Sequence, residues 1–326
     1  MTSTTSPVRA AGVHMALPSR LRERLLSFVD PEAVIEWYSD IDTAVSASLD
    51  AELVYLTLPV VRTVEIRQLV TGAQRLRWMH LNMVGVDTLD LSPLRDRGIL
   101  LTNGAGLAAV PVAEHVLMCV LAASRSLPAL VLAQSRHEWA KDAARGDDLF
   151  GRTALVLGWG NLGRAVAERL RAMGVQVTGA RRQPGDDPSV VSGEGWRELL
   201  PQADFVIVCL PLTARTNNLI GPDELGLMKK SAWLINVARG GVVNELALAA
   251  ALGSGVIAGA AVDVFEVEPL PSEHPFWTAP NLILTPHVAW KSNLADHRAV
   301  ALFESRLRQY LVEPASLPLV DLDEGY

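Results

Sequence analysis

The chain has 326 residues, of which 49% are hydrophobic and 20% are charged, so it is a globular protein long enough for two hydrophobic cores. Its net charge of −7 excludes a basic surface for nucleic acid and a polybasic patch for a membrane. Its two cysteines lie far apart in apolar runs, which favours buried thiols in a reducing compartment. Because the first ten residues lack the apolar core of a signal peptide, we expect a cytoplasmic protein.

The first third of the chain has the pattern of a smaller α/β unit. Short apolar runs alternate with helical patterns such as Leu17–Phe28, and this alternation predicts a parallel sheet covered by helices on both faces. The expected strands are Val8–Val13, Ala33–Tyr38, Leu53–Leu58, Leu76–Leu81 and Gly98–Leu101.

A glycine-containing turn, Leu81–Asp87, follows the fourth of these strands. The backbone N–H groups of Val84 and Gly85 could form a concave site for an anion. The alternative is a plain turn from strand to helix, and the residues alone leave both interpretations open.

A long apolar segment separates this unit from the rest of the chain. The pattern predicts a helix over Ala109–Leu127, with Pro111 in its first turn. A helix that is apolar on every side is buried, so we expect it where two domains meet. Residues 128–150 mix charged and aromatic residues, and we expect them to be an irregular arm or a partner surface.

The next stretch, Ala154–Arg182, has the order strand, glycine turn, helix, strand. In that context the glycines of Gly158-Trp159-Gly160-Asn161-Leu162-Gly163 indicate a dinucleotide-binding turn. Gly158 would make the tight turn, Gly160 would let a pyrophosphate approach, and Gly163 would let the helix pack closely. The alternative is an ordinary βαβ turn in which the glycines serve geometry only.

Six strands with intervening helices then fit a doubly wound, Rossmann-type parallel sheet. They are expected at Thr153–Leu157, Val175–Thr178, Phe205–Leu210, Ala232–Val237, Ile257–Val262 and Leu282–Leu284. A last helix, Ser292–Leu311, would return to the first unit. We therefore predict a flavodoxin-like substrate-binding domain from residues 1–108 and 292–326, and a dinucleotide-binding domain from residues 109–291.

The loop after the second of these strands bears on the choice of cofactor. An NAD site usually has an acidic residue about 20 positions beyond the glycines. This chain has Arg181 and Arg182 there, which would attract the 2′-phosphate of NADP. We expect NADP to be preferred; the alternative is that the arginines are merely solvated and NAD is used.

Three polar residues follow the fourth, fifth and sixth strands, at the edge of the sheet where ligands bind in this fold. Arg239 could bind a carboxylate and polarise a carbonyl, His287 could supply a proton, and Glu268 could hold the imidazole and favour its charged form. Each also has a plain interpretation, as a solvated loop arginine, a surface acid or a structural histidine. That all three plain interpretations hold at once is less probable than that any single one does.

The sequence carries no recognised spacing for a metal or a P-loop. The patterns H-E-x-x-H, C-x-x-C and G-K-[ST] are absent from the chain, and the other six histidines show no ligand spacing.

With these motifs the chain resembles the D-isomer-specific 2-hydroxyacid dehydrogenase family over nearly its whole length. The matching segments are Gly85-Val86-Asp87, Ala113-Glu114-His115, Gly158–Gly163, Leu210–Thr213, Asn236–Gly241, Asp263–Pro271 and Thr285–His287. Within the family, His287-Val288-Ala289-Trp290 and the paired arginines look most like glyoxylate/hydroxypyruvate reductases. The resemblance implies an oxidoreductase that reduces a small 2-keto acid to the D-2-hydroxy acid with NADP or NAD.

The resemblance also implies roles for individual residues. Arg239, Glu268 and His287 would be catalytic, the amides of Val84 and Gly85 would hold the substrate carboxylate together with Arg239, and Trp290 would line the pocket. The cofactor would contact Gly158, Gly160, Asn161, Leu162, Gly163, Arg181, Arg182, Leu210, Pro211, Thr216, Val237, Ala238, Arg239, Asp263 and His287. A homodimer would form mainly through the dinucleotide domains.

Two other functions remain open at this point. The family includes transcriptional corepressors that sense nucleotides, and it includes dehydrogenases of other oxyacids such as phosphite. No appended interaction tail is visible in the sequence, which favours the enzyme.

Overall fold

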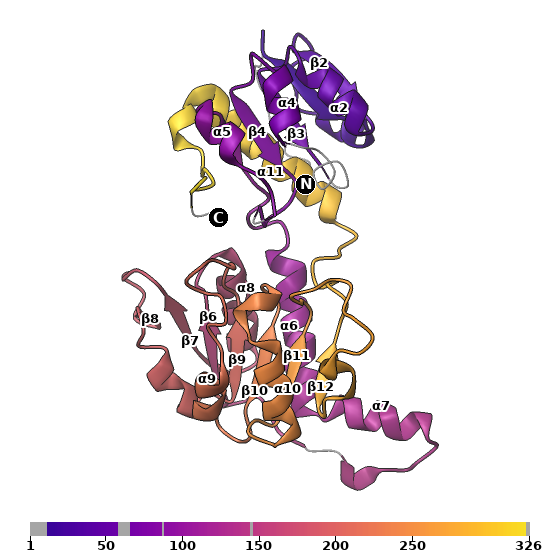
Figure 1. The fold of residues 1–326 in the computed structure, drawn as a ribbon, viewed down its shortest axis with the longest axis vertical. Helices are drawn as coiled ribbons and strands as arrows, with labels where there is room; N and C mark the ends of the chain where they lie inside the picture. Colours follow the sequence, from indigo (N-terminus) through magenta and orange to yellow (C-terminus); the bar gives the residue numbers. More distant parts are fainter. Residues whose placement is uncertain (1–11, 58–65, 87, 144–145, 324–326) are drawn as a thin grey trace. The chain divides into compact units, whose positions relative to one another are not determined.

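A computed structural model describes residues 12–57, 66–86, 88–143 and 146–323 of the chain. The chain forms two compact units, which we call unit 1 and unit 2 (Figure 1). Unit 1 consists of Met1–Leu107 and Ser292–Tyr326, and unit 2 consists of Ala108–Lys291. Unit 1 is thus assembled from both ends of the sequence.

Unit 1 contains a five-stranded parallel sheet in the order β2-β1-β3-β4-β5. This is the flavodoxin-like order, so the predicted fold class is confirmed for unit 1. The strands are β1 (His14–Pro18), β2 (Val34–Tyr38), β3 (Leu53–Leu56), β4 (Trp78–Leu81) and β5 (Leu100–Thr102). The helices are η1 (Ser19–Leu21), α1 (Arg22–Leu25), α2 (Ile41–Ser48), α4 (Ile66–Gly72), α5 (Ser92–Asp96), α11 (Ala295–Val312) and η6 (Pro314–Ser316).

The first predicted strand and the first predicted helix were wrong in their bounds. Residues 8–11 of the expected strand Val8–Val13 lie outside the described residues, and the strand that forms is His14–Pro18. Gly12 has a φ of +83°, which an extended strand does not allow, so pairing begins after it. Because Leu17 and Pro18 belong to that strand, the helical part of Leu17–Phe28 shrinks to Ser19–Leu25. Leu58, the end of another expected strand, also lies outside the described residues.

The core of unit 1 includes the last helix of the chain. Phe303 of α11 is fully buried, and its ring stacks on Tyr55 with centroids 4.4 Å apart and on Trp78 with centroids 6.0 Å apart. Leu307 and Tyr310 lie in the same buried cluster. The helix therefore supplies part of the core that the N-terminal strands need.

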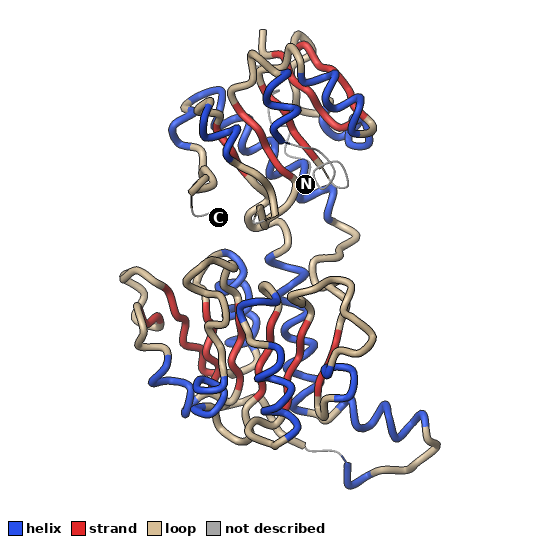
Figure 2. Tube along the Cα trace, in the orientation of Figure 1, coloured by secondary structure: helices blue, strands red, loops and turns tan. Residues whose placement is uncertain are grey.

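Unit 2 contains a seven-stranded parallel sheet in the order β12-β11-β10-β9-β6-β7-β8 (Figure 2). The strands are β6 (Thr153–Leu157), β7 (Gln176–Arg181), β8 (Val190–Ser192), β9 (Phe205–Val208), β10 (Trp233–Asn236), β11 (Gly259–Val262) and β12 (Leu282–Leu284). The helices are α6 (Ala109–Ser124), α7 (Leu127–Ser135), η2 (Lys141–Ala143), α8 (Asn161–Ala172), η3 (Arg197–Gln202), α9 (Pro222–Leu227), η4 (Gly240–Val242), α10 (Glu245–Gly253) and η5 (Pro275–Thr278).

This order confirms the predicted doubly wound sheet. The six expected strands form, and β8 is an additional short edge strand that the sequence analysis missed. Its three residues are only partly buried or exposed, so they carry no strong apolar signal.

The long apolar helix ends earlier than predicted. α6 stops at Ser124, because Ser126 takes a left-handed φ of 53° and Pro128 follows. Residues 128–135, expected to be irregular, belong instead to α7 (Leu127–Ser135), which extends away from the sheet of unit 2 (Figure 1). No single helix in the described chain is long and apolar enough to cross a membrane; the bent pair α6 and α7 reaches that length and composition only together.

The register of the sheet aligns the ends of its strands. Leu157 pairs with Ala180 and Val208, Val208 pairs with Asn236, and the same row continues through Val262 to Leu284. Because all these strands are parallel, the residues that follow this row lie along one edge, which we call the carboxyl edge. That is where a doubly wound fold binds its ligands.

Candidate active site

The glycine turn lies at the carboxyl edge between β6 and α8. Gly158 has a φ of +106°, and a Cβ on it would lie 2.5 Å from the carbonyl oxygen of Cys209, so glycine is required. A Cβ on Gly163 would lie 1.9 Å from the carbonyl oxygen of Gly158, and the helix packs directly on the turn. Among the described residues, no atom outside its two chain neighbours lies within 4 Å of where a Cβ on Gly160 would be. The turn therefore leaves open space beside the first turn of α8.

The start of α8 fits an anionic group such as a pyrophosphate. Its N-cap, Gly160, has no side chain to accept hydrogen bonds from the first backbone N–H groups of the helix, and the exposed Asn161 follows it. No acidic side chain lies in the first turn of the helix. Free N–H groups and the positive end of the helix dipole together favour negative charge at this position.

The end of β7 carries the two arginines. Arg181 is half-buried and its guanidinium lies against Gly185, where a Cβ would be 2.5 Å from Nη1; Arg182 is exposed. The loop that follows also brings Asp187 to the glycine turn, where its Oδ2 accepts a hydrogen bond of 3.2 Å from Trp159 Nε1. The sequence analysis did not place this acid there. The two arginines would thus attract a phosphate at this position, and the aspartate would repel it.

The residues after β9 and β10 form the next part of the edge. Leu210 is half-buried and Pro211 exposed, and the Thr216 hydroxyl donates a hydrogen bond of 2.6 Å to the Pro211 carbonyl oxygen, so this hydroxyl shapes its own loop. Val237 and Ala238 are buried.

Arg239 follows directly and is half-buried. The buried Asn236 fixes its backbone by donating 2.9 Å to the Arg239 carbonyl oxygen while accepting 3.1 Å from the Ala238 N–H. The arginine itself donates from Nη1 to the Ala238 carbonyl oxygen at 2.8 Å.

Glu268 and His287 contact each other. His287 Nδ1 lies 2.7 Å from Glu268 Oε2, and Glu268 Oε1 accepts a hydrogen bond of 3.0 Å from the Phe265 N–H. An ionised carboxylate only accepts, so Nδ1 carries the hydrogen and Nε2 is the nitrogen that can take or give a proton. Each side chain is 36% exposed, which leaves the pair open to a ligand.

The backbone of His287 is held by Asp263. His287 has a φ of +51°, an uncommon conformation for a residue other than glycine. Its N–H donates to the Asp263 carbonyl oxygen at 2.8 Å, and the Asp263 carboxylate accepts from the N–H groups of Val288 and Ala289, each at 3.0 Å. Asp263 is 2% exposed, so its role in the structure is to shape this loop. Trp290, 40% exposed, donates from Nε1 to the His287 carbonyl oxygen at 2.9 Å.

This loop is also tied to α6. Thr285 Oγ1 donates to Asp263 Oδ1 at 2.6 Å and lies 3.1 Å from His115 Nε2. Since the hydroxyl hydrogen is used on Asp263, the Thr285 oxygen accepts from the His115 Nε2–H. Burial lowers the pKa of His115 and so favours the neutral ring. The nearby charge of Asp263 acts on this pKa in the opposite direction and is the smaller effect.

Val84 and Gly85 belong to unit 1, in the turn after β4. Asn103 Nδ2 donates 2.6 Å to the Val84 carbonyl oxygen, and the Gly104 N–H donates 2.7 Å to that of Met83. Within the described part of the chain the N–H groups of Val84 and Gly85 donate to no other group. The turn thus presents two free amides beside an exposed Val84 side chain; Asp87 of the same motif lies outside the described residues.

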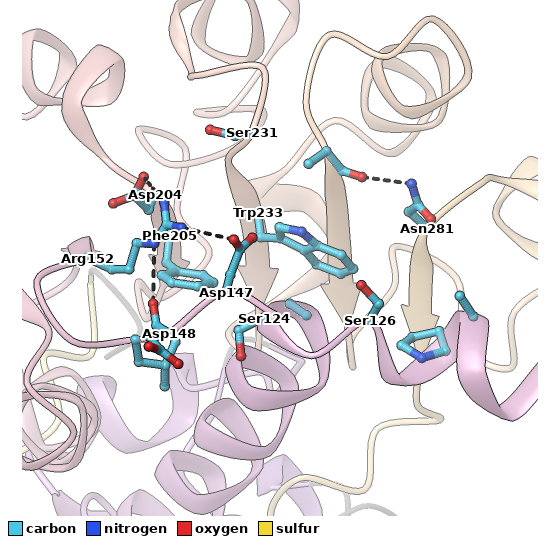
Figure 3. Close-up of a pocket in the computed structure, with 15 residues that line it drawn as sticks. Ser124, Ser126, Asp147, Asp148, Arg152, Asp204, Phe205, Ser231, Trp233 and Asn281 are labelled. Carbon is cyan, nitrogen blue, oxygen red and sulfur yellow. Dashed lines mark hydrogen bonds and ion pairs between the residues drawn. The ribbon is translucent and has the colours of Figure 1, made fainter. Parts of the chain in front are cut away.

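A separate pocket lies at the amino ends of the strands of unit 2. Figure 3 shows Asp147, Asp204 and Arg152 pointing toward one another there, with Arg152 3.2 Å from Asp147 and 3.7 Å from Asp204. Phe205 and Trp233 line the same pocket. Because it lies opposite the carboxyl edge, we assign it no part in the candidate site.

The described residues contain no cluster of three or more His, Cys, Asp or Glu that could hold a metal ion. Both cysteines are free thiols, and burial raises the pKa of Cys119 and of Cys209 to about 12, so neither is a reactive thiolate.

The carboxyl edge of unit 2 presents a glycine turn at the start of a helix, a cationic side chain after β10 and a histidine–carboxylate pair after β11 and β12. Groups of these kinds suit a phosphate, an anionic substrate and the transfer of a proton. Sequence reasoning found these residues and quoted Thr285 and His115 only as parts of matching motifs, so it missed their contact with each other and with Asp263. The motifs Ala113-Glu114-His115 and Thr285–His287 were the available signals.

Comparison with known proteins agrees with these features. A sequence model of the family described as "D-isomer specific 2-hydroxyacid dehydrogenase, NAD binding domain" matches residues 117–289. A glyoxylate reductase of Korarchaeum cryptofilum is 33% identical over 247 residues, covering 72% of this chain and 73% of that protein. A D-3-phosphoglycerate dehydrogenase of Methanocaldococcus jannaschii is also 33% identical, over 75% of this chain but 47% of that protein. The chain thus spans about half the length of such relatives.

Solved structures also resemble this chain over nearly its whole length. A D-isomer specific 2-hydroxyacid dehydrogenase from Xanthobacter autotrophicus Py2, in complex with NADPH and MES, is 28% identical with a TM-score of 0.80. The alignment covers 97% of this chain and 100% of that one.

Proposed function

The chain belongs to the D-isomer specific 2-hydroxyacid dehydrogenase family, and from that premise we propose that it reduces a small 2-keto acid to the D-2-hydroxy acid with a nicotinamide dinucleotide. The observation that supports this most is the His287–Glu268 contact of 2.7 Å on the same edge of the sheet as the glycine turn. A histidine held by a carboxylate is suited to give a proton to a developing alkoxide.

The roles of the three side chains follow from the reaction. Reduction of a keto acid needs a hydride and a proton, and the cofactor supplies the hydride when bound. His287 gives its Nε2 proton to the carbonyl oxygen, and Glu268 holds the ring at Nδ1. Arg239 binds the substrate carboxylate and polarises the carbonyl, which its planar guanidinium can do with two parallel hydrogen bonds.

The remaining contacts complete the proposal. The free amides of Val84 and Gly85 would hold the substrate carboxylate, and Trp290 would bound the pocket. The pyrophosphate would lie on the turn Gly158–Gly163 and the first turn of α8. Leu210, Pro211, Thr216, Val237, Ala238 and Asp263 would surround the rest of the cofactor.

We propose that NADPH is preferred over NADH, because Arg181 and Arg182 can make charge-assisted hydrogen bonds to a 2′-phosphate. Each such bond contributes roughly 1.5–3 kcal/mol, so one alone would give a preference of about ten- to a hundred-fold in kcat/KM, and two would give more. The NADPH complex of the Xanthobacter relative supports this assignment. Asp187 opposes it, since its carboxylate would repel a phosphate that came close.

Glyoxylate and hydroxypyruvate are the proposed substrates, supported by the glyoxylate reductase of Korarchaeum cryptofilum. We place the enzyme in the cytoplasm, as a homodimer formed through unit 2; free thiols suit a reducing compartment.

The test is a panel of glyoxylate, hydroxypyruvate and other 2-keto acids, each assayed with NADPH and with NADH by loss of nicotinamide absorbance. We expect turnover of at least one small 2-keto acid and its abolition in Arg239→Ala. Tight NADPH binding without turnover of any keto acid would favour a nucleotide-sensing protein, and oxidation of phosphite would favour another oxyacid dehydrogenase.

Two substitutions test the cofactor assignment separately. Arg181→Asp should lower kcat/KM with NADPH far more than with NADH, and Asp187→Asn should raise kcat/KM with NADPH. A wild-type enzyme that prefers NADH would show that the two arginines do not select the 2′-phosphate of NADPH.

A further inference from the structure

The carboxylate of Glu245 is unusual for the first residue of a helix. It follows the N-cap Asn244 of α10, a position that is normally solvated, yet its side chain is only 10% exposed. Burial raises the pKa of Glu245, and the charges of Glu266 and Glu268 act in the same direction. A buried carboxylate must be fully hydrogen-bonded to be tolerated, so its partners indicate what it is for.

Both oxygens of Glu245 have partners outside its own helix. Oε1 accepts a hydrogen bond of 2.7 Å from the Glu266 N–H, and Oε2 lies 3.2 Å from His274 Nε2. His274 Nδ1 in turn accepts from the Phe276 N–H at 3.3 Å, which leaves Nε2 as the ring nitrogen that carries a hydrogen. A neutral His274 can therefore donate to Glu245.

The Glu266 N–H lies within the turn that carries Glu268. In that turn, residues 265–268, the Phe265 N–H donates to Glu268 Oε1 at 3.0 Å. The other oxygen of Glu268 faces His287 Nδ1 at 2.7 Å. The hydrogen bond from Glu266 to Glu245 thus fixes the turn two residues from the carboxylate that holds the histidine.

The same turn also packs against the segment that carries Arg239. A Cβ on Gly240 would lie 2.0 Å from the Phe265 carbonyl carbon and 2.2 Å from the Glu266 nitrogen, so the two backbones are in direct contact. A displacement of residues 265–266 would therefore disturb Arg239 as well as Glu268.

We propose that Glu245, supported by His274, is a positioning residue that holds the turn 265–268 so that Glu268 stays against His287. This inference rests on the proposed function for its kinetic consequences but not for its structural one. Misplacing a catalytic group by about 1 Å can lower a rate by about 100-fold. Glu245→Ala should therefore reduce kcat by about 10- to 100-fold and change KM much less.

The experiment combines kinetics with a spectroscopic signal of the histidine. In ¹⁵N-histidine-labelled protein, a hydrogen-bonded Nδ1–H of His287 gives a downfield proton resonance, assigned by its loss in His287→Ala. We expect Glu245→Ala to weaken or abolish this resonance while the circular dichroism spectrum stays native. Glu245→Gln, whose amide oxygen can still accept from the Glu266 N–H, should retain the resonance and most of kcat.

Glu224→Ala is the matched control. Glu224 also lies in the first turn of a helix, is 15% exposed, and accepts from the Gly221 N–H and from Arg197, both at 3.0 Å. In the described chain its hydrogen bonds and ion pair go to Gly221 and Arg197 and not to the turn 265–268, so its loss should cost stability and leave both the resonance and kcat unchanged.

An unchanged resonance and kcat in folded Glu245→Ala would overturn the proposal, and so would an equal loss in Glu224→Ala. Where Glu245→Ala does not fold, His274→Ala removes one partner of Glu245 and should weaken the same resonance; no change there would also overturn it. If the wild type reduces no keto acid, the proposed function fails while the resonance comparison still decides the role of Glu245.

Discussion

His287 adopts a backbone conformation that costs about 1–3 kcal/mol for a residue other than glycine. The cost is offset by the hydrogen bonds that Asp263 makes with residues 287–289. The loop is therefore fixed before any ligand arrives, and the imidazole can face Glu268 without rearrangement.

Replacing the Glu268 carboxylate should slow the reaction. The contact of 2.7 Å between Glu268 Oε2 and Nδ1 orients the ring of His287. Glu268→Gln keeps the shape but replaces a charge-assisted hydrogen bond by a weaker neutral one, so kcat should fall while KM for the keto acid changes less. The measurement is kcat and KM of this variant beside those of the wild type.

His287→Ala provides the reference for that experiment. It should lower kcat by roughly 10²–10⁴, the usual contribution of a general acid. A kcat of Glu268→Gln equal to that of the wild type would assign Glu268 a surface role.

At this scale the sequence predicted the proposed catalytic residues and missed the contacts that support them. Arg239, Glu268 and His287 each follow an apolar strand, so their position at one edge could be inferred. The contact of Thr285 with His115 joins residues 170 positions apart, and that of Glu245 with His274 depends on the path of an irregular loop. Such contacts exist only in the folded chain and leave no local pattern.

The helices α6 and α7 present apolar side chains that unit 2 does not cover. Met118 and Leu121 on α6 and Leu127, Val131 and Leu132 on α7 are 37–54% exposed. Exposed apolar side chains gathered on one pair of helices indicate a partner surface, and a second copy of the chain is the partner we expect. The sequence analysis anticipated a partner surface here but not a helix, since Leu127–Ser135 lacks a polar face.

Replacing two of these side chains should weaken the dimer. We expect wild-type protein to sediment at about twice the 35.2 kDa of one chain, and Val131→Glu with Leu132→Glu to shift it toward the monomer, because burying two charges is costly. Leu227→Glu on α9, at a site 45% exposed, is the control and should leave the mass unchanged. A monomeric wild type at micromolar concentration would contradict the prediction.

The two units have separate hydrophobic cores, and the last helix of the chain completes the core of unit 1. The sequence analysis expected the last helix to return to the first unit, and its residues Val300, Phe303, Leu307 and Tyr310 are buried. It could not indicate the exact strand bounds of unit 1, because short apolar runs extend past the residues that pair.

Phe303→Ala should therefore destabilise one unit selectively. Removing a buried phenylalanine costs about 3–5 kcal/mol, and Phe303 packs only with residues of unit 1 in the contacts described for its ring. We expect the unfolding transition of unit 1 to move to a lower denaturant concentration. The affinity for NADPH, measured by calorimetry, should stay within about a factor of two.

Ile207→Ala, in the core of unit 2, should instead lower the stability of unit 2 and leave that of unit 1 unchanged. A single transition that shifts equally in both variants would show that the two units unfold together.

The contact of Gly240 with the turn 265–266 also limits how such an enzyme can be altered, in the laboratory or by natural selection. Any larger residue at position 240 must push apart two backbones, each of which carries one of the proposed catalytic side chains. Substitutions in the two segments should therefore be non-additive, with the second acceptable only after the first has made room. A variant library that samples residues 239–241 and 264–268 together should recover active combinations that two successive single-segment libraries discard.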